Sequence, residues 1–170
     1  MGTCIKCGKP TQEEWHEYCE ECYRKPPKQQ REGRKKGGKR PSRGLPEDYL
    51  KEGYFDEKGN LRPELITTHA LSIAQTLAGA KMTTAALRRF FGKVRFAQRR
   101  LDSTDDFSGV IPEILALKPY VANAVTRRVV PGLFKQFIER NVDLAVKDAK
   151  SFHEGFVKHF EYVVAFFPRK

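Results

Sequence analysis

The chain has 170 residues and carries 32 Lys or Arg against 21 Asp or Glu, a formal net charge of +11. Its length suits one ordinary domain with an appendage and argues against two full domains. A positive charge of this size indicates an acidic partner, and nucleic acid is the commonest such partner for a basic protein. A membrane surface is the weaker alternative.

Two classes of protein are excluded by what the sequence lacks. No apolar run approaches the roughly 18 residues that span a bilayer, and the stretch MGTCIKCGKP lacks the apolar core of a secretory signal. We therefore expect a soluble, intracellular protein with no membrane partner. The chain also has no H-E-x-x-H, no G-x-S-x-G and no P-loop. These absences predict that the protein is not an enzyme. The remaining alternative is an enzyme that uses His69, His153 or His159 with scattered carboxylates.

The charge is unevenly distributed and divides the chain into three parts. Residues 1–24 carry a net charge of −2, and residues 45–170 carry +5. Between them, residues 25–44 contain nine Lys or Arg against Glu32 alone, a net charge of +8. That segment is too polar and too rich in Gly and Pro to bury a core. We therefore predict a small module at 1–24, a flexible basic linker at 25–44 and a body at 45–170.

All four cysteines lie in the module, as the pairs Cys4–Cys7 and Cys19–Cys22. Each C-x-x-C places two thiolates on one turn, and two facing turns complete a tetrahedral site for a structural Zn²⁺. Gly8 follows the first pair, where such a turn needs backbone freedom. A segment this short has almost no core, so the metal would supply the folding energy. The alternatives are two disulfides, a redox pair or iron in place of zinc.

The body has the pattern of a helical protein. From Leu45 onward, periodic segments alternate with short breaks, and no stretch alternates polar and apolar residues for long enough to form a sheet. The pattern predicts an all-α fold, a compact bundle of about five helices. Pro63 suits a first turn, Thr83 or Thr84 can cap the second helix, and Pro119 should kink or break the third. The expected helices cover residues 63–79, 82–100, 112–128, 131–146 and 151–167.

The last expected helix opens on Ser151 with Glu154 three residues later, the pattern of a capping box. An apolar stripe along this helix predicts that the others pack around it. We expect His153 and His159 to face solvent, and His69 to be a hydrogen-bonded histidine at the edge of the core. The stripe consists of Phe152, Phe156, Phe160, Val163 and Phe167.

The second expected helix, MTTAALRRFFGKVRFAQRR, has two distinct faces. At 100° per residue one arc is apolar and predicts burial. This arc contains Leu87, Phe90, Phe91, Val94, Ala97 and Leu101. The remaining surface carries five Arg and one Lys, and no Asp or Glu lies between Met82 and Leu101. The basic residues are Arg88, Arg89, Lys93, Arg95, Arg99 and Arg100.

A solvated helix face usually mixes charges, because like charges four residues apart repel. A face that accepts this repulsion meets acids on another element or meets phosphate, and Arg offers paired donors suited to phosphate. We therefore predict phosphate contact by the six basic residues, with a solvated or internally paired face as the alternative. Phe96 interrupts this face and could stack on a base or touch a neighbouring subunit. Further candidates at the ends or breaks of helices are Lys81, Lys118, Arg127 and Arg128.

Three segments of the body carry a family pattern: MTTAALRRFFGKV (82–94), ILALKPYVANAVTRR (114–128) and SFHEGFVKHFEYVVAF (151–166). Through them, roughly residues 60–170 resemble the small all-helical subunit of type III-A CRISPR effector complexes, the Csm-type small subunit. The resemblance implies a bundle that stacks in several copies along guide RNA and target RNA and contacts their backbone. The positions that match the family are Thr83, Thr84, Arg88, Arg89, Phe90, Lys118 and Arg127.

Some positions depart from that family pattern. Asn123 stands where the family usually has an aromatic residue, and Phe167, Pro168 and Arg169 replace a final His-Lys. The zinc module and the basic linker are additions. The expected function is a non-catalytic RNA-binding scaffold subunit of the effector complex in antiviral defence, with other subunits and further copies of itself as partners. The alternative is a zinc-ribbon DNA-binding or transcription-associated protein with a helical dimerisation body.

Overall fold

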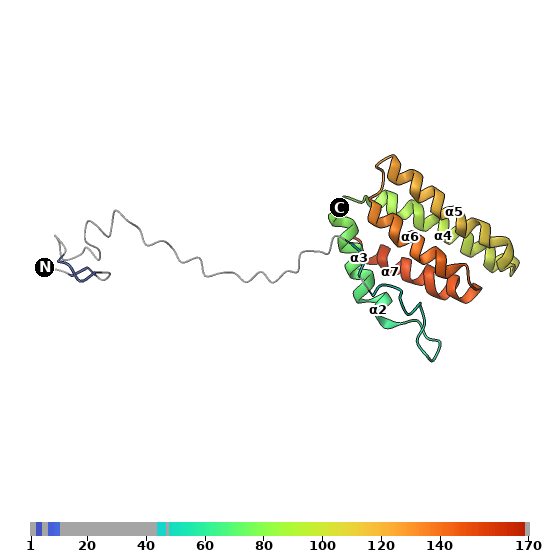
Figure 1. Ribbon diagram of the computed structural model, residues 1–170, viewed down its shortest axis with the longest axis horizontal. Coiled ribbons are helices and arrows are strands. Elements are labelled where there is room, and N and C mark those ends of the chain that lie inside the picture. Colours follow the sequence, from blue (N-terminus) through green and yellow to red (C-terminus); the bar gives the residue numbers. More distant parts are fainter. Residues whose placement is uncertain (1–2, 5–6, 11–43, 47, 169–170) are drawn as a thin grey trace. The chain divides into compact units, whose positions relative to one another are not determined.

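The computed structural model describes residues 3–4, 7–10, 44–46 and 48–168 (Figure 1). The chain divides into two compact units, Met1–Gly38 and Lys39–Lys170. The boundary predicted at residue 24 and nearly all of the predicted linker lie outside the described residues. Among those residues, no helix combines the length and apolar character that crossing a membrane requires.

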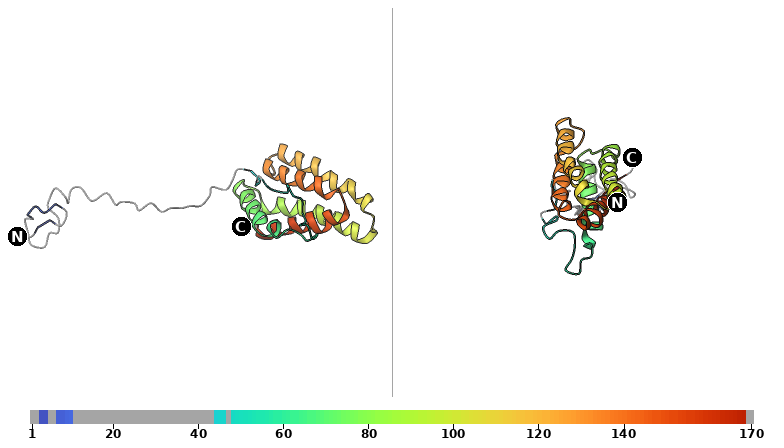
Figure 2. Two further views of the ribbon diagram at one scale, coloured as in Figure 1. Left: turned by 60° about the horizontal axis from the view of Figure 1, so that its bottom comes forward. Right: turned by 90° about the vertical axis from the view of Figure 1, so that its right-hand side faces the viewer.

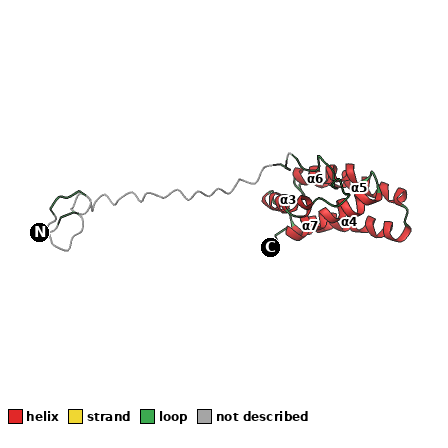
Figure 3. Cartoon of the chain, turned by 90° about the horizontal axis from the view of Figure 1, so that it is seen from below, coloured by secondary structure: helices red, strands yellow, loops and turns green. Residues whose placement is uncertain are grey.

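From Pro63 onward the described part of the second unit is built of helices joined by short connections, and the all-α fold that the sequence predicts is confirmed there (Figure 3). The described residues of this unit form no β-strand, and Phe55 and Leu61 make the only isolated β-bridge there. The five expected helices are all present, the first as a broken pair and the last with a π-helical start. The elements are α2 (Pro63–Ile66), α3 (Thr68–Gly79), α4 (Thr84–Thr104), α5 (Phe107–Thr126), α6 (Gly132–Ala145), η1 (Ser151–Val157) and α7 (Lys158–Phe166).

The first predicted helix is interrupted at Thr67, whose φ of −119° and ψ of −94° separate α2 from α3. The Thr67 hydroxyl donates to the Pro63 carbonyl at 2.7 Å, a local bond that competes with regular helix. The Leu65 carbonyl accepts instead from the His159 imidazole, at 2.6 Å. In an unbroken helix that carbonyl would accept the amide N–H of His69. A tertiary contact therefore accounts for the break.

The helix α5 begins five residues before the predicted start at Pro112. Asp106 caps it, accepting a hydrogen bond from the Gly109 amide at 3.1 Å. A Cβ at residue 109 would lie 2.5 Å from Asp106 Oδ2, so only glycine admits this cap. Both Pro112 and Pro119 lie inside the helix, and the break predicted at Pro119 does not occur.

The capping box predicted at Ser151 is wrong. Asp148 is the cap: its Oδ1 accepts from the Ser151 amide at 2.7 Å and its Oδ2 from the Ser151 hydroxyl at 2.8 Å. Residues 149 and 150 are already helical, and Glu154 pairs with Lys150 at 3.8 Å instead of reaching back to a cap. The predicted apolar stripe is confirmed, since all five of its residues are buried.

Aromatic rings from three elements form the centre of the core. The rings of Phe137 and Phe160 meet edge to face with centroids 5.1 Å apart, which joins α6 to α7. Phe90 packs on Phe134 at 5.1 Å and Phe91 on Phe160 at 5.3 Å, both also edge to face. Such pairs stabilise beyond the area that they bury. These contacts fix the orientation of α4 against the rest of the bundle (Figure 2).

Residues 48–62, here called the strap, run along the bundle before α2 and insert two tyrosines into it. Tyr49 and Tyr54 are both buried. The Tyr54 hydroxyl donates to Asn141 Oδ1 at 2.9 Å, and Asn141 Nδ2 donates to the Tyr49 hydroxyl at 2.6 Å. The Tyr49 hydroxyl lies 2.8 Å from His159 Nε2. The strap is thus joined to α6 and α7 by buried hydrogen bonds.

His159 is completely buried, so the expectation that it faces solvent is wrong. Its neighbours fix its tautomer. The Leu65 carbonyl can only accept, so Nδ1 carries the proton and Nε2 accepts from the Tyr49 hydroxyl. Burial, opposed in part by the bond to Leu65, lowers the pKa of His159 to about 4. The neutral imidazole is therefore part of the core at physiological pH.

Candidate nucleic-acid interface

The basic helix α4 is held in the bundle by its predicted apolar arc. Thr83 caps it by accepting a hydrogen bond from the Ala86 amide at 3.1 Å, as predicted. Five of the six arc residues are buried and Phe91 is half-buried. Because the apolar arc is anchored, the basic residues on the other side have fixed positions. They form two rows along the helix, and the two rows have different surroundings.

The first row contains Arg88, Arg95 and Arg99. Arg88 and Arg99 are exposed, and their side chains make no hydrogen bond or ion pair to any residue that the structure describes. Arg95 is half-buried and donates to Gln98 Oε1 at 2.7 Å. Gln98 Nε2 lies 2.9 Å from His153 Nε2 of η1. Arg95 is therefore engaged within the protein, while the other two guanidinium groups are available to a ligand.

The second row contains Arg89, Lys93 and Arg100, and Phe96 lies among them. This row is beside α5. Arg100 forms an ion pair with Glu113, so it is not an unpaired cation. The Lys93 ammonium lies over the Tyr120 ring, 4.1 Å from its centroid. Arg89 is exposed and makes no hydrogen bond or ion pair within the described part of the chain.

A surface hollow of about 540 Å³ lies between α4 and α5. Arg100 contacts Glu113 near the start of α5, whereas Lys93, earlier in α4, contacts Tyr120, later in α5. The two helices are therefore antiparallel and form a hairpin (Figure 1). Nothing in the sequence indicates this hollow, because it depends on how the two helices align. Its lining residues are Arg89, Gly92, Lys93, Phe96, Glu113, Ala116, Leu117 and Tyr120.

The further candidates are not all near α4. Lys118 forms an ion pair with Asp143 of α6 at 2.5 Å, on the side of α5 that faces α6. Arg127 and Arg128 end α5, and Lys81 precedes α4. Because α4 and α5 are antiparallel, the start of α4 and the end of α5 lie at the same end of the hairpin. Lys81, Arg127 and Arg128 are all at that end. All three are exposed, and their side chains have no hydrogen bond or ion pair to the residues described.

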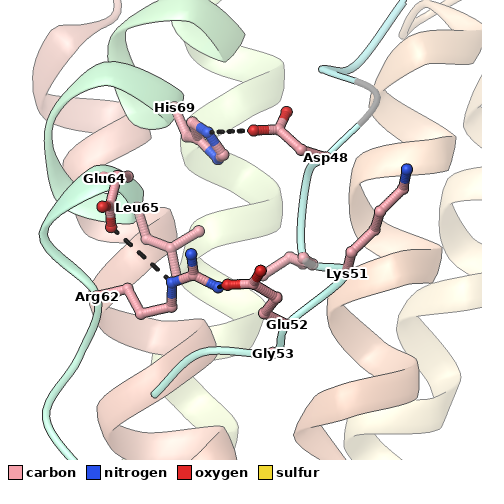
Figure 4. Close-up of a pocket in the computed structure, with 9 residues that line it drawn as sticks. Asp48, Lys51, Glu52, Gly53, Arg62, Glu64, Leu65 and His69 are labelled. Carbon is pink, nitrogen blue, oxygen red and sulfur yellow. Dashed lines mark ion pairs between the residues drawn. The ribbon is translucent and has the colours of Figure 1, made fainter. Parts of the chain in front are cut away.

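A second hollow, of about 240 Å³, lies between the strap and the start of the helices (Figure 4). His69 Nε2 is 3.7 Å from Asp48 Oδ2, and Arg62 pairs with Glu52 and with Glu64. His69 Nδ1 is buried and has no hydrogen-bond partner among the described residues, and the distance from Nε2 to Asp48 is too long for a hydrogen bond. The expectation of a hydrogen-bonded His69 is therefore not met in the described part of the chain. These contacts fasten the strap to α2 and α3.

In the first unit, the structure describes the turn that carries the first cysteine pair. The Cys4 amide donates to the Lys9 carbonyl and the Gly8 amide to the Cys4 carbonyl, both at 2.9 Å. Gly8 has a φ of +71°, the left-handed conformation for which the sequence suggests glycine. Cys4 is buried and Cys7 is exposed. The partners expected to complete the zinc site, Cys19 and Cys22, lie outside the described residues.

Comparison with known proteins identifies the body. The family model described as Csm2 Type III-A matches residues 60–169, a range that includes all three segments that carry the family pattern. The chain has no significant match among curated proteins or among solved structures. The matched range covers well over half of the 170 residues. The chain therefore belongs to the Csm2 type III-A family and is a subunit of a type III-A CRISPR effector complex.

Proposed function

We propose that the chain is a non-catalytic scaffold subunit that binds the phosphate backbone of guide RNA and target RNA without reading their sequence. The observation that supports this most directly is the exposed side of α4. Arg88, Arg89 and Arg99 extend from it without an acidic partner among the described residues. Such unpaired guanidinium groups on a rigid helix suit phosphate oxygens, which accept paired N–H donors.

The geometry also supports backbone contact rather than sequence readout. Arg88 and Arg99 are separated by eleven residues, about 16 Å along the helix axis. Cations spaced along one rigid element follow a phosphate backbone, whereas base readout needs side chains that reach base edges in a groove. Lys81, Arg127 and Arg128 extend the unpaired charge at the hairpin end. We propose that the half-buried Arg95 and the paired Arg100 and Lys118 have a supporting role.

Membership of the family supports the remaining partners. An effector subunit assembles with other subunits, and we propose that several copies of this chain associate along the RNA in the prokaryotic cytoplasm. We further propose that residues 1–24 fold around a structural Zn²⁺ held by Cys4, Cys7, Cys19 and Cys22. The turn at Gly8 supports this, since it places one C-x-x-C on a tight bend. The basic residues 25–44 would add affinity for RNA that is not sequence-specific.

The test is a charge reversal with a matched control. In the full chain, Arg88→Glu, Arg89→Glu and Arg99→Glu are combined, and affinity for single-stranded RNA is measured over a range of salt concentrations. The slope of log K against log salt should become shallower by about 0.7 for each phosphate that the variant no longer neutralises. Helical content, followed by circular dichroism, should not change, because all three residues are exposed.

The control variant combines Lys51→Glu, Lys58→Glu and Lys147→Glu, which change the net charge equally at exposed positions outside α4. An equal decrease of affinity in both variants would mean that only net charge matters and that α4 is not the binding site. Deleting residues 1–44 separates the proposal from the alternative, a DNA-binding zinc module. If the shortened chain still binds RNA, the result supports the body, and if it does not, the result supports the module and linker.

A further inference from the structure

The hollow between α4 and α5 exposes two aromatic rings. Phe96 is 59% exposed and Tyr120 is 51% exposed, more than any other large hydrophobic side chain that the structure describes. Both line the hollow. Exposing one aromatic residue needs no explanation, but two on opposite walls of one hollow form an apolar surface that suits a planar ligand. The volume of about 540 Å³ is within the range of small-molecule sites.

The remaining lining residues give the hollow a definite chemical character. The Lys93 ammonium is held over the Tyr120 ring, and Arg89 lies on the same wall as Lys93. Between them Gly92 adds no side chain, and a Cβ there would meet no atom within 4 Å. Aromatic rings interleaved with cations are the combination that binds single-stranded nucleic acid, where bases stack and phosphates meet positive charge. An apolar protein segment would gain nothing from the two cations.

Glu113 provides an independent indication of the ligand. Its Oε1 accepts from Arg100, whereas its Oε2 is buried and has no hydrogen-bond partner among the described residues. A buried acceptor without a partner costs free energy, which a donor from a ligand would offset. A carboxylate accepts from the amino group of a base, as it does from cytosine N4. Glu113 lines the hollow, and a rotation of its carboxylate would bring the buried Oε2 within reach of a ligand there. The hollow therefore combines stacking surfaces and cations with a carboxylate acceptor on its wall.

We propose that this hollow binds one unpaired base of the RNA held by α4. Lys93 leaves the Tyr120 ring for an adjoining phosphate, and the base then stacks on Phe96 and Tyr120. The amino group of the base approaches Glu113, and Arg89 faces a second phosphate. The inference rests on the proposed function, because it requires that the chain binds RNA at α4. It goes beyond that function, because backbone contact alone uses no base.

The first experiment separates base from backbone. The full chain is titrated with a short oligocytidylate and with an abasic ribose-phosphate strand of the same length. The oligocytidylate should bind about tenfold more tightly, since stacking one base on aromatic side chains is of this size. Equal affinity for the two strands would overturn the base site and leave the phosphate contacts intact. If neither strand binds at low salt, the proposed function fails as well.

The second experiment tests the location. Phe96→Ala with Tyr120→Ala should remove the preference for the oligocytidylate over the abasic strand. The matched control, Tyr162→Ala with Phe166→Ala, removes two exposed aromatic residues of α7 and should keep that preference. If the first variant keeps the preference but no longer self-associates in light scattering, the hollow is a contact between copies and the proposal is wrong.

The third experiment tests Glu113. Uracil has a carbonyl oxygen where cytosine has its amino group, so the parent should prefer oligocytidylate to oligouridylate by several-fold. Glu113→Gln should abolish this preference, because an amide can also donate to the uracil oxygen. The readout is the ratio of the affinities for the two oligonucleotides. Loss of the ion pair between Glu113 and Arg100 would change the affinity for both strands equally and would leave this ratio unchanged. An unchanged ratio in the variant would exclude Glu113 from base contact.

Discussion

The ring of Tyr54 lies so close to Gly155 that a Cβ on residue 155 would be 2.5 Å from Tyr54 Cδ2. Gly155 belongs to the π-helical stretch η1, and Tyr54 belongs to the strap. Because Gly155 has no side chain, the Tyr54 ring can pack directly against its backbone. Most of the strap precedes residue 60, where the family match begins. The strap is nevertheless part of the folded body rather than an extension of the linker.

Gly155→Ala should destabilise the protein by displacing Tyr54 from this contact. Overpacking of this kind costs about 1–3 kcal/mol, and the hydrogen bond from Tyr54 to Asn141 would be strained as well. Urea denaturation measures the change in the free energy of unfolding. Gly92→Ala is the control, because it lies inside a helix with open space around it and should stabilise by about 1 kcal/mol. Equal effects of the two variants would contradict the close contact.

The buried His159 should make the stability depend on pH. Its pKa is lowered to about 4 in the folded protein, compared with about 6.5 in an unfolded chain. Between these values the unfolded state binds a proton that the folded state does not. The stabilisation is therefore complete above pH 6.5 and is lost as the pH falls towards 4, by about 3 kcal/mol in total.

Urea denaturation at several pH values between 7.5 and 4.5 checks this dependence. His159→Gln cannot titrate and should flatten the dependence in that window, although it lowers the stability at pH 7. A parent-like slope in the His159 variant would assign the pH dependence to other groups.

Truncation should distinguish the strap from the segments before it. Deleting residues 1–43 should leave the free energy of unfolding nearly unchanged. Deleting residues 1–62 also removes Tyr49 and Tyr54, each of which contributes about 1.5–3 kcal/mol by burial. It further leaves Asn141 and His159 without their tyrosine partners. Thermal denaturation of the two truncated chains should differ clearly, and equal melting temperatures would mean that the strap adds no stability.

The first unit should contain one Zn²⁺ per chain. Cys19→Ser or Cys4→Ser should release the metal, because a structural tetrahedral site needs all four ligands. The helical signal of the body should persist after metal removal by a chelator, since the body is a compact unit with its own core. Elemental analysis of the purified protein is the measurement. Iron in place of zinc, or no metal at all, would contradict the prediction.

The features that could be predicted from the sequence depend on neighbouring residues along one helix. The apolar arc of α4 and its Thr83 cap are of this kind, since helical periodicity and a local side chain determine them. Prediction fails where several local signals compete: Pro112 suits a helix start, but Asp106 with Gly109 makes the better cap. The same competition places the last cap at Asp148 instead of Ser151.

Features that join distant segments could not be predicted. The expectation of a solvent-exposed His159 fails because nothing near it in sequence indicates its partners, Tyr49 and Leu65, which lie some ninety or more positions away. For the same reason the sequence does not reveal the pairing of Arg100 with Glu113, nor the hollow beside α5. Which cations of α4 lack an acidic partner depends on the alignment of two helices, and periodicity within one helix carries no information about it.

The antiparallel pairing of α4 with α5 gives the hairpin an electrical polarity. Near its closed end Arg100 is neutralised by Glu113 and Arg99 alone is unpaired, whereas near its open end Lys81, Arg88, Arg89, Arg127 and Arg128 have no ion pair among the described residues. A polyanion that crosses the hairpin therefore meets a gradient of unbalanced charge and not a uniform surface. A strand held in this way has a preferred direction of approach, and successive copies of the subunit would present the same direction to it.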